Sequence, residues 1–263
     1  MKLPIWIGAC LVAVATQAMA ATPVVPKVGF DDVHVSVSDP GKAGAWYVKY
    51  LGATATQTPT RVSFGSWLVI FGQNPAAKPS AQSVIDHIGL SFGDISAKIK
   101  ELEAAGAKVI APVRDAPGLF KYAYVEDPWG IKIELVQDTD LAGFHHVHVN
   151  VPDTVATLKW FEDTFGGERT KLRGLLEGLR YSGVWLFATA TKPGEQRGAS
   201  RDHTIRNIGL RVTDAKAAAA ALTSAGQKVT RGPSVTRVEG KDVGFLFVDD
   251  PNGIEIEMVQ RFQ

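Results

Sequence analysis

Cysteine is nearly absent from this sequence of 263 residues, since Cys10 is the only one. A single thiol cannot form an internal disulfide, and a chain that loses Cys10 with a leader keeps no thiol nucleophile. An excess of one charge is also absent. The formal net charge is +1 and there is no basic stripe, so we expect no nucleic-acid partner. The balance of 45% hydrophobic and 21% charged residues is that of an ordinary globular protein.

Long apolar runs are missing too, apart from a short one at the N-terminus. Lys2 precedes an apolar segment over 3–15, which is short for a membrane span. The sequence AMA at 18–20 follows, a small-x-small pattern typical of signal-peptide cleavage. We therefore predict that residues 1–20 are a signal peptide and that the mature chain has no stable membrane insertion. The expected location is the bacterial periplasm or the outside of the cell.

Internal repetition is the most informative feature that is present. Three pairs of segments nearly match: 126–137 (EDPWGIKIELVQ) and 249–260 (DDPNGIEIEMVQ), 87–90 (HIGL) and 207–210 (NIGL), and 32–37 (DVHVSV) and 146–151 (HVHVNV). The chain is therefore predicted to hold four copies of one module. The second and fourth copies are siblings, and so are the first and third.

Each module is predicted to open with a strand and a capped helix. Aspartates that suit a helix N-cap and glycines that suit a left-handed helix end recur in order: Asp39 and Gly52, Asp94 and Gly106, Asp153 and Gly166, Asp214 and Gly226. Short strand-like runs complete each unit as β-α-β-β-β. We predict an α+β fold of four βαβββ modules. They would pair into two half-barrel domains over 28–138 and 143–262, with 138–143 as the joint.

Strand alternation separates an apolar side from a polar side in each module. The apolar side must cover the module's own helix, so His87 in the opening strand of module two points away from it. Asp32 and His34 in module one, and Glu134 in the closing strand of module two, point away in the same manner. Such a polar face can simply be solvated. If modules one and two pack side by side, however, two imidazoles and a carboxylate converge as a facial triad for a divalent metal.

At these residues the chain resembles the vicinal oxygen chelate superfamily, which includes glyoxalases, bleomycin resistance proteins and extradiol dioxygenases. The resemblance covers the whole mature chain and implies four modules in two pairs. It also implies a metal held by opening-strand histidines of two paired modules and a closing-strand glutamate. Carried over, His87 and Glu134 fall on ligand positions, and His34 is the first-module ligand. Asp32 is a rival or additional ligand.

The run YVEDPWG at 124–130 also resembles the extradiol dioxygenase signature. This resemblance implies that Tyr124 orients or protonates an intermediate, so Tyr124 and Glu134 are the expected catalytic residues. The acid–base histidine of extradiol enzymes has no counterpart at 111–121.

The second half of the chain departs from the pattern. Asn207 stands where module two has a histidine, and Phe247 stands where it has a tyrosine. Asparagine is a poor ligand for zinc or iron, so we expect this half to be structural or to line a substrate. The opposite assignment is a site formed by His146, His148 and Glu257.

The resemblance leads to two functional hypotheses. The first is an exported metal-dependent enzyme that chelates two neighbouring oxygens of a small organic substrate, as an isomerase, a lyase or a dioxygenase. Its cofactor would be a divalent ion such as Fe²⁺, Mn²⁺, Ni²⁺ or Zn²⁺. The second is a metal-free protein that binds a small, antibiotic-like molecule in the cleft between modules. Members of this superfamily also pair modules between chains, which leaves a homodimer open.

Overall fold

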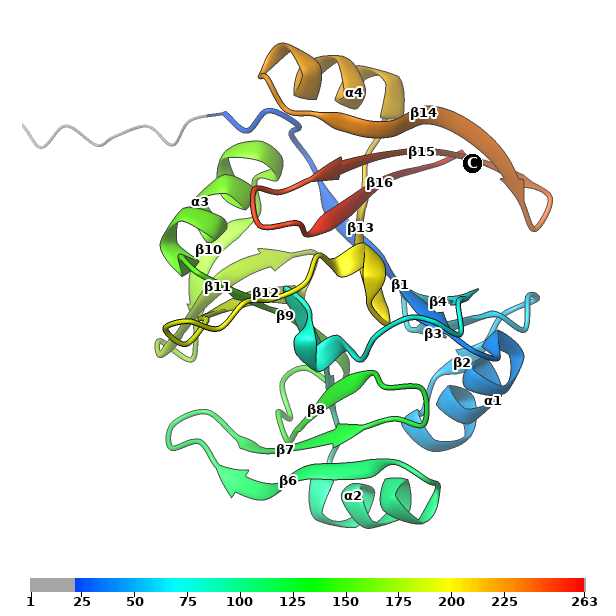
Figure 1. Cartoon of the computed structure of the whole chain (residues 1–263), viewed down its shortest axis with the longest axis vertical. Coiled ribbons are helices and arrows are strands. Elements are labelled where there is room, and N and C mark those ends of the chain that lie inside the picture. Colours follow the sequence, from blue (N-terminus) through cyan, green and yellow to red (C-terminus); the bar gives the residue numbers. More distant parts are fainter. Residues whose placement is uncertain (1–21, 263) are drawn as a thin grey trace, which may run out of the picture.

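The computed structural model describes residues 22–262, so the predicted signal peptide and Cys10 lie outside the described residues. Within this range no helix is both long and apolar enough to span a bilayer. Four successive modules each consist of one strand, one helix and three further strands. Figure 1 shows them as four helix-bearing units along the chain.

Modules one and two begin the chain. Module one comprises β1 (Gly29–Val37), α1 (Pro40–Leu51), β2 (Thr54–Ala55), β3 (Arg61–Phe64) and β4 (Trp67–Gln73). A short 3-10 helix, η1 (Ser80–Gln82), precedes module two. Module two comprises β5 (Ile85–Ser91), α2 (Ile95–Ala104), β6 (Lys108–Asp115), β7 (Lys121–Glu126) and β8 (Lys132–Val136).

Modules three and four repeat this order. Module three comprises β9 (Gly143–Val151), α3 (Thr154–Phe165), β10 (Glu168–Leu172), β11 (Leu176–Tyr181) and β12 (Val184–Ala190). The 3-10 helix η2 (Ser200–Asp202) precedes module four. Module four comprises β13 (Ile205–Arg211), α4 (Ala215–Ser224), β14 (Val229–Val238), β15 (Lys241–Asp249) and β16 (Glu255–Arg261).

The predicted aspartates begin all four helices. In α2, for example, Asp94 accepts hydrogen bonds from the backbone amides of Ser96 and Ala97, at 2.9 and 3.0 Å. These bonds satisfy amides that have no partner within the helix. At the other end of α1, Gly52 adopts a left-handed conformation with φ of 76°, which suits glycine. The helix positions in the repeat are therefore confirmed.

The modules pair in an order that the sequence pattern does not show. Modules one and four form one eight-stranded sheet, called here the terminal sheet, in the order β14-β15-β16-β13-β1-β4-β3-β2. Modules two and three form the other, the central sheet, in the order β10-β11-β12-β9-β5-β8-β7-β6. The α+β fold of four βαβββ modules in two pairs is confirmed. The predicted packing of module one beside module two is wrong, and each sheet draws on both halves of the chain.

The linkers between modules explain this pairing. Residues 137–142 alone separate β8 from β9, so module three folds back directly beside module two. The longer linkers 74–84 and 191–204 each cross from one sheet to the other and bond to one another. The amide of Val84, for example, lies 3.0 Å from the carbonyl oxygen of Gly198. All four opening strands share one alternation, so any two of them satisfy the pattern, and the linkers decide which pair forms.

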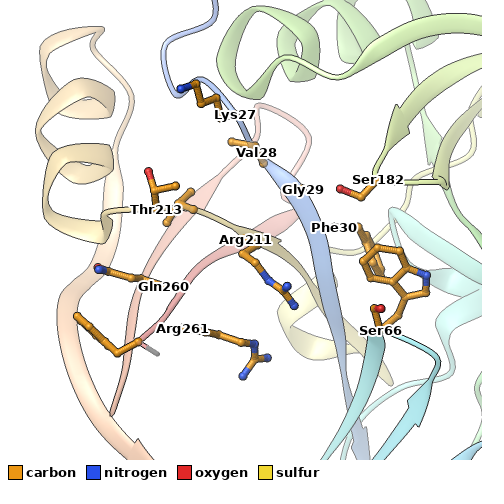
Figure 2. A pocket seen from close by; sticks show the side chains of 13 residues that line it. Lys27, Val28, Gly29, Phe30, Ser66, Ser182, Arg211, Thr213, Gln260 and Arg261 are labelled. Atoms are coloured by element: carbon orange, nitrogen blue, oxygen red, sulfur yellow. The ribbon is translucent and has the colours of Figure 1, made fainter. Parts of the chain in front are cut away.

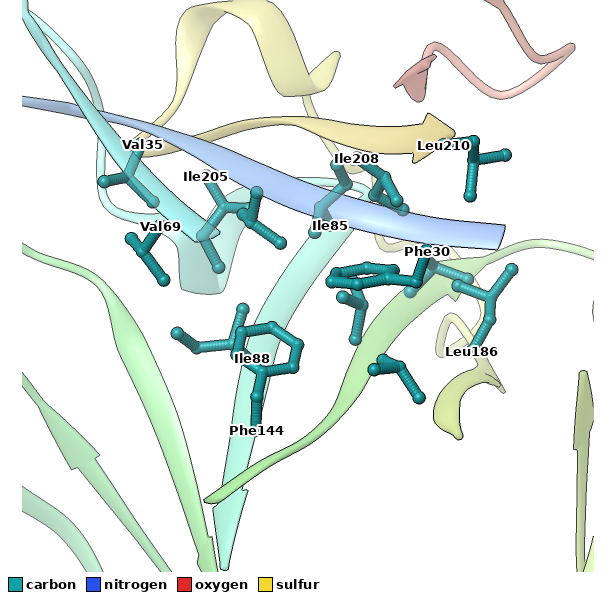
Figure 3. Packing of buried hydrophobic residues seen from close by; sticks show 14 of the residues in the cluster. Phe30, Val35, Val69, Ile85, Ile88, Phe144, Leu186, Ile205, Ile208 and Leu210 are labelled. Atoms are coloured by element: carbon teal, nitrogen blue, oxygen red, sulfur yellow. The ribbon is translucent and has the colours of Figure 1, made fainter. Parts of the chain in front are cut away.

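Apolar sides of the two sheets form one shared core. Figure 3 shows its centre, where Phe30 and Ile208 of the terminal sheet pack with Ile88 and Phe144 of the central sheet. The rings of Phe30 and Phe144 are 5.3 Å apart, and all four side chains are buried. Since side chains alternate along a strand, the polar sides of the central strands point away from this core.

A β-bulge interrupts the opening strand of modules one and three at matching places. The register between β1 and β13 shifts between Phe30 and Asp32, and that between β5 and β9 shifts beside His145. Asp31 and His145 are the extra residues, and both are fully buried. A bulge re-aims the neighbouring side chain, so Asp32 and His146 project from the polar sides of their sheets.

Candidate metal centres

Four potential ligands meet on the polar side of the central sheet. His87 lies on β5, Glu134 on the neighbouring β8, and His146 and His148 on β9. One ligand atom from each of the four lies within 4.8 Å of the others. Glu134 Oε2 is 2.9 Å from His87 Nε2 and 3.2 Å from His146 Nε2. The cluster therefore presents three imidazoles and one carboxylate to a single point, a donor set suited to divalent transition metals.

Each imidazole of this cluster has one ring nitrogen held by a partner outside it. Asp86 Oδ1 lies 2.6 Å from Nδ1 of His87, and His145 Nδ1 lies 2.8 Å from Nδ1 of His146. Thr189 Oγ1 lies 2.6 Å from Nε2 of His148. The other ring nitrogen is thereby left for a metal, which is how outer partners orient histidine ligands.

One buried nitrogen of the cluster, Nδ1 of His148, has no hydrogen-bond partner within residues 22–262. Nε2 of His146 lies 3.2 Å from Glu134 Oε2 but forms no hydrogen bond of good geometry. Buried polar atoms without a well-aligned partner are uncommon in proteins, so both nitrogens fit a metal-binding role. A divalent metal bound between the imidazoles and Glu134 would satisfy both nitrogens.

The protonation of three of the four ligands also suits a metal, which binds neutral imidazoles and ionised carboxylates. Burial lowers the pKa of His146 and of His148, so both imidazoles stay neutral near pH 7. Burial raises the pKa of Glu134, but the neighbouring imidazoles of His146 and His87 outweigh it and hold that pKa well below its usual range. Burial lowers the pKa of His87 as well, but hydrogen bonds with Asp86 and Glu134 outweigh it and raise that pKa, so a metal competes with a proton for this imidazole.

A glycine on β5 makes room for the imidazole of His146 in this cluster. Gly89 on β5 lies opposite both Glu134 and His146 in the strand register. A Cβ atom at this position would lie 2.0 Å from Cε1 of His146. The imidazole therefore lies across β5 in space that any side chain would fill.

Tyr124 lies beside the cluster, as the sequence predicted. It faces Glu134 directly across the β7–β8 pair, and its ring centroid is 5.3 Å from that of His87. Burial raises the pKa of Tyr124, and the charge of Glu134 raises it further. The phenol thus keeps its proton and can donate it in a hydrogen bond.

Outer residues extend the network in ways that the sequence analysis missed. Asp86 forms ion pairs with Lys132 and Arg197, whereas Asp138 Oδ2 lies 3.3 Å from His145 Nε2. Lys132 also lies 4.7 Å from the ring centroid of Tyr124, so it is part of the site rather than a solvated side chain. Asp86 and His145 each directly precede a ligand in the sequence, which is the one signal that pointed to them.

A second cluster occupies the matching place on the terminal sheet. Asp32 and His34 lie on β1 and Glu257 on β16, and one ligand atom of each lies within 4.8 Å of the others. His34 Nε2 is 3.0 Å from Glu257 Oε2 and 3.6 Å from Asp32 Oδ1. Gly209 takes the part of Gly89, since a Cβ atom there would lie 2.1 Å from Asp32 Oδ1.

This second cluster is poorer in nitrogen than the first. Asn207 pairs with His34 in the terminal sheet, at the place where His87 pairs with His148 in the central sheet. Phe247 faces Glu257 at the place where Tyr124 faces Glu134 in the central sheet. Burial raises the pKa of Asp32 well above its usual range. Oxygen-rich sets of this kind suit hard cations better than zinc or iron.

The structure thus regroups the predicted site residues. His87 and Glu134 meet His146 and His148, not His34, so the predicted triad of His34, His87 and Glu134 is wrong. His34 and Asp32 belong to the terminal sheet, and both take part in its cluster. The alternative site of His146, His148 and Glu257 is wrong as well, because Glu257 also lies on the terminal sheet. The cause is the module pairing, and the metal-binding roles themselves stay predictions.

A pocket of about 800 Å³ belongs to neither cluster. It lies at one end of the terminal sheet, where Figure 2 shows Lys27, Arg211 and Arg261 on its walls. Arg211 and Arg261 both pair with the buried Asp31 of the bulge. Asp31 offsets one of these two positive charges, and the pocket lining includes no metal-ligand candidate.

Comparisons with known proteins agree with this architecture. The family model described as Glyoxalase/Bleomycin resistance protein/Dioxygenase superfamily matches residues 29–135 and 143–258. Glyoxalase I from Zea mays is similar over 89% of this chain and 92% of its own, at 16% identity and a TM-score of 0.70. A putative dioxygenase from Bacillus subtilis is similar over 88% of this chain and 84% of its own, at 17% identity and a TM-score of 0.60. No sequence among the curated proteins matches. At these identities the structural likeness concerns the fold alone.

Proposed function

Because the chain belongs to the glyoxalase/bleomycin resistance protein/dioxygenase superfamily, we propose that it is a metal-dependent enzyme with its metal centre on the central sheet. The observation that carries the proposal is the cluster of His87, His146, His148 and Glu134. Each imidazole is oriented from outside, and Nδ1 of His148 has no hydrogen-bond partner within residues 22–262. These residues would hold Fe²⁺, Mn²⁺, Ni²⁺ or Zn²⁺.

The substrate we propose is a small organic molecule with two neighbouring oxygens. When bound in the cluster, a divalent ion supplies Lewis acidity toward such oxygens. The protein contributes the proton chemistry around them. Tyr124 keeps its phenolic proton beside Glu134 and would donate a hydrogen bond to an oxygen that becomes negative during the reaction. The site is consistent with an isomerase, a lyase or a dioxygenase.

The outer network supports this chemistry by holding the ligands in place. Asp86 is held between Lys132 and Arg197, and it in turn fixes the ring of His87. His145 does the same for His146 from the bulge of β9. Outer partners of this kind set the tautomer of a ligating histidine and typically contribute 10–100-fold to metal affinity.

Metal content of the purified mature protein tests the proposal. We expect wild type to retain a transition metal, and His146→Gln and Glu134→Gln to lose it. His34→Gln, a matched change on the terminal sheet, should leave that ion in place. A wild type that takes up no metal after reconstitution under reducing conditions would contradict the proposal and favour the metal-free binding protein.

Export is the second part of the proposal. Residues 1–20 would direct the chain out of the cytoplasm and be removed after Ala20. The intact mass of protein recovered from periplasmic and culture fractions tests this, since the mature chain should begin at Ala21. Protein that keeps residues 1–20 and stays in the cytoplasm would contradict export without affecting the metal centre.

A further inference from the structure

A cavity of about 340 Å³ opens above the second cluster, on the polar side of the terminal sheet. Strands of modules one and four line it together. The hairpin of β14 and β15 reaches across to module one, where Glu239 at its tip accepts a hydrogen bond of 2.6 Å from Thr58 Oγ1. A volume of this size lies in the range of small-molecule pockets.

Three guanidinium groups line this cavity, and two of them form no ion pair within residues 22–262. The third, that of Arg261, pairs with the buried Asp31, which it shares with Arg211. Arg61 on β3 and Arg231 on β14 form no ion pair with any carboxylate of residues 22–262. Arg61 and Arg231 come from strands near opposite edges of the terminal sheet, and two guanidinium groups without an ion pair in one cavity are suited to binding a carboxylate.

Polarity changes with depth in the cavity. Asp32 and Glu257 lie at its floor with 1% and 7% of their surface exposed, whereas Arg231 is exposed and Arg61 half-buried at the rim. Most of the other lining residues are apolar, the exceptions being His34 and Thr236. Phe247 is the main wall residue, and the guanidinium carbon of Arg231 lies 3.6 Å from the centroid of its ring. This stacking fixes the plane of the guanidinium while its N–H edge stays available.

We propose that this cavity is a second ligand site, separate from the metal centre of the central sheet, and that it binds a small organic carboxylate with an apolar body. The carboxylate lies at the rim between Arg61 and Arg231. The apolar body lies against Phe247, the neighbouring Phe245, and Val259, which faces Phe245 across the β15–β16 pair. The carboxylate of Glu257 at the floor disfavours the opposite orientation by repulsion.

Calorimetric titration of the mature protein with benzoate tests the proposal, with benzamide as the neutral analogue of the same shape. We expect benzoate to bind at least tenfold more tightly than benzamide. Arg61→Gln and Arg231→Gln should each weaken benzoate binding by roughly tenfold or more, as expected for a lost charge-assisted hydrogen bond.

Two control variants test whether benzoate binds in this cavity and not elsewhere on the protein. Arg237→Gln changes an arginine of the same strand, β14, that pairs with Asp242 and does not line the cavity. It should leave benzoate binding unchanged. Glu134→Gln removes a ligand of the central sheet and should leave it unchanged as well. Absence of benzoate binding, equal binding of benzamide, or full binding by both Arg61→Gln and Arg231→Gln would overturn the proposal, whatever the metal content of the central sheet.

Discussion

Replacing Gly89 by alanine should prevent metal binding by the central cluster although none of the proposed ligands is substituted. The backbone of Gly89 has no left-handed conformation, so alanine is tolerated there as far as the chain itself is concerned. Its Cβ atom, however, would lie 2.0 Å from Cε1 and 2.1 Å from Nδ1 of His146. Ordinary contacts begin near 3.4 Å, so the imidazole must move by roughly 1.4 Å.

A movement of this size exceeds what a metal site tolerates. Ligands must keep their positions to within about 0.5 Å, so Gly89→Ala should remove His146 from the cluster. We expect metal affinity to fall by at least 10–100-fold, the loss typical of disturbing even an outer partner. Overpacking should also lower the free energy of unfolding of the metal-free protein by about 1–3 kcal/mol.

Competition between the protein and a chelating dye for Zn²⁺ measures the affinity, and urea unfolding of the metal-free protein measures the stability. Gly93→Ala is the matched control, because a Cβ atom there meets nothing within 4 Å. Gly209→Ala is the second control, because it displaces Asp32 on the terminal sheet and should leave the central ion bound. If Gly89→Ala bound Zn²⁺ as tightly as wild type, His146 would not be a ligand and the reasoning would fail.

Two further predictions concern the fold. Burial raises the pKa of Asp127 from 3.8 to about 7, so the folded protein holds this proton more tightly than the unfolded chain. The contribution of Asp127 to the free energy of unfolding is therefore complete below about pH 4 and falls by roughly 4 kcal/mol at most as the pH rises to 7. Asp127→Asn should flatten this part of a plot of urea midpoint against pH. An unchanged slope would contradict the raised pKa of Asp127. Asp94→Ala removes the cap of α2 and should lower the free energy of unfolding by about 1 kcal/mol, whereas Ser96→Ala, which keeps its backbone amide, should change it by less than about half as much. Equal losses in both variants would show that the cap is not the cause.

Much of the architecture can be predicted from local patterns in the sequence. Alternation along β5 places His87 on the polar side of its strand, and an aspartate such as Asp94 marks where a helix begins. The near-identity of 126–137 and 249–260 identifies the modules as copies. These features depend on residues close together in the chain, so no knowledge of the tertiary structure is needed to find them.

Only half of the residues that form the central cluster could be grouped correctly from the sequence. Glu134 and His87 belong to one module, and their meeting follows from the strand order within it. His146 and His148 come from another module, and their pairing with His87 depends on β9 lying beside β5. By sequence pattern alone, β1 is as good a neighbour for β5 as β9 is, because both strands carry potential metal ligands at alternate positions.

Local sequence patterns specify the module, its repetition and the side of each strand on which the histidines and glutamates lie. Which modules share a sheet, and therefore which ligands meet, depends on contacts between residues far apart in the chain. Alternation specifies a face of the sheet but not the neighbouring strand. Here the neighbour was chosen by the short connection 137–142 and by the two longer linkers that cross between the sheets and bond to each other.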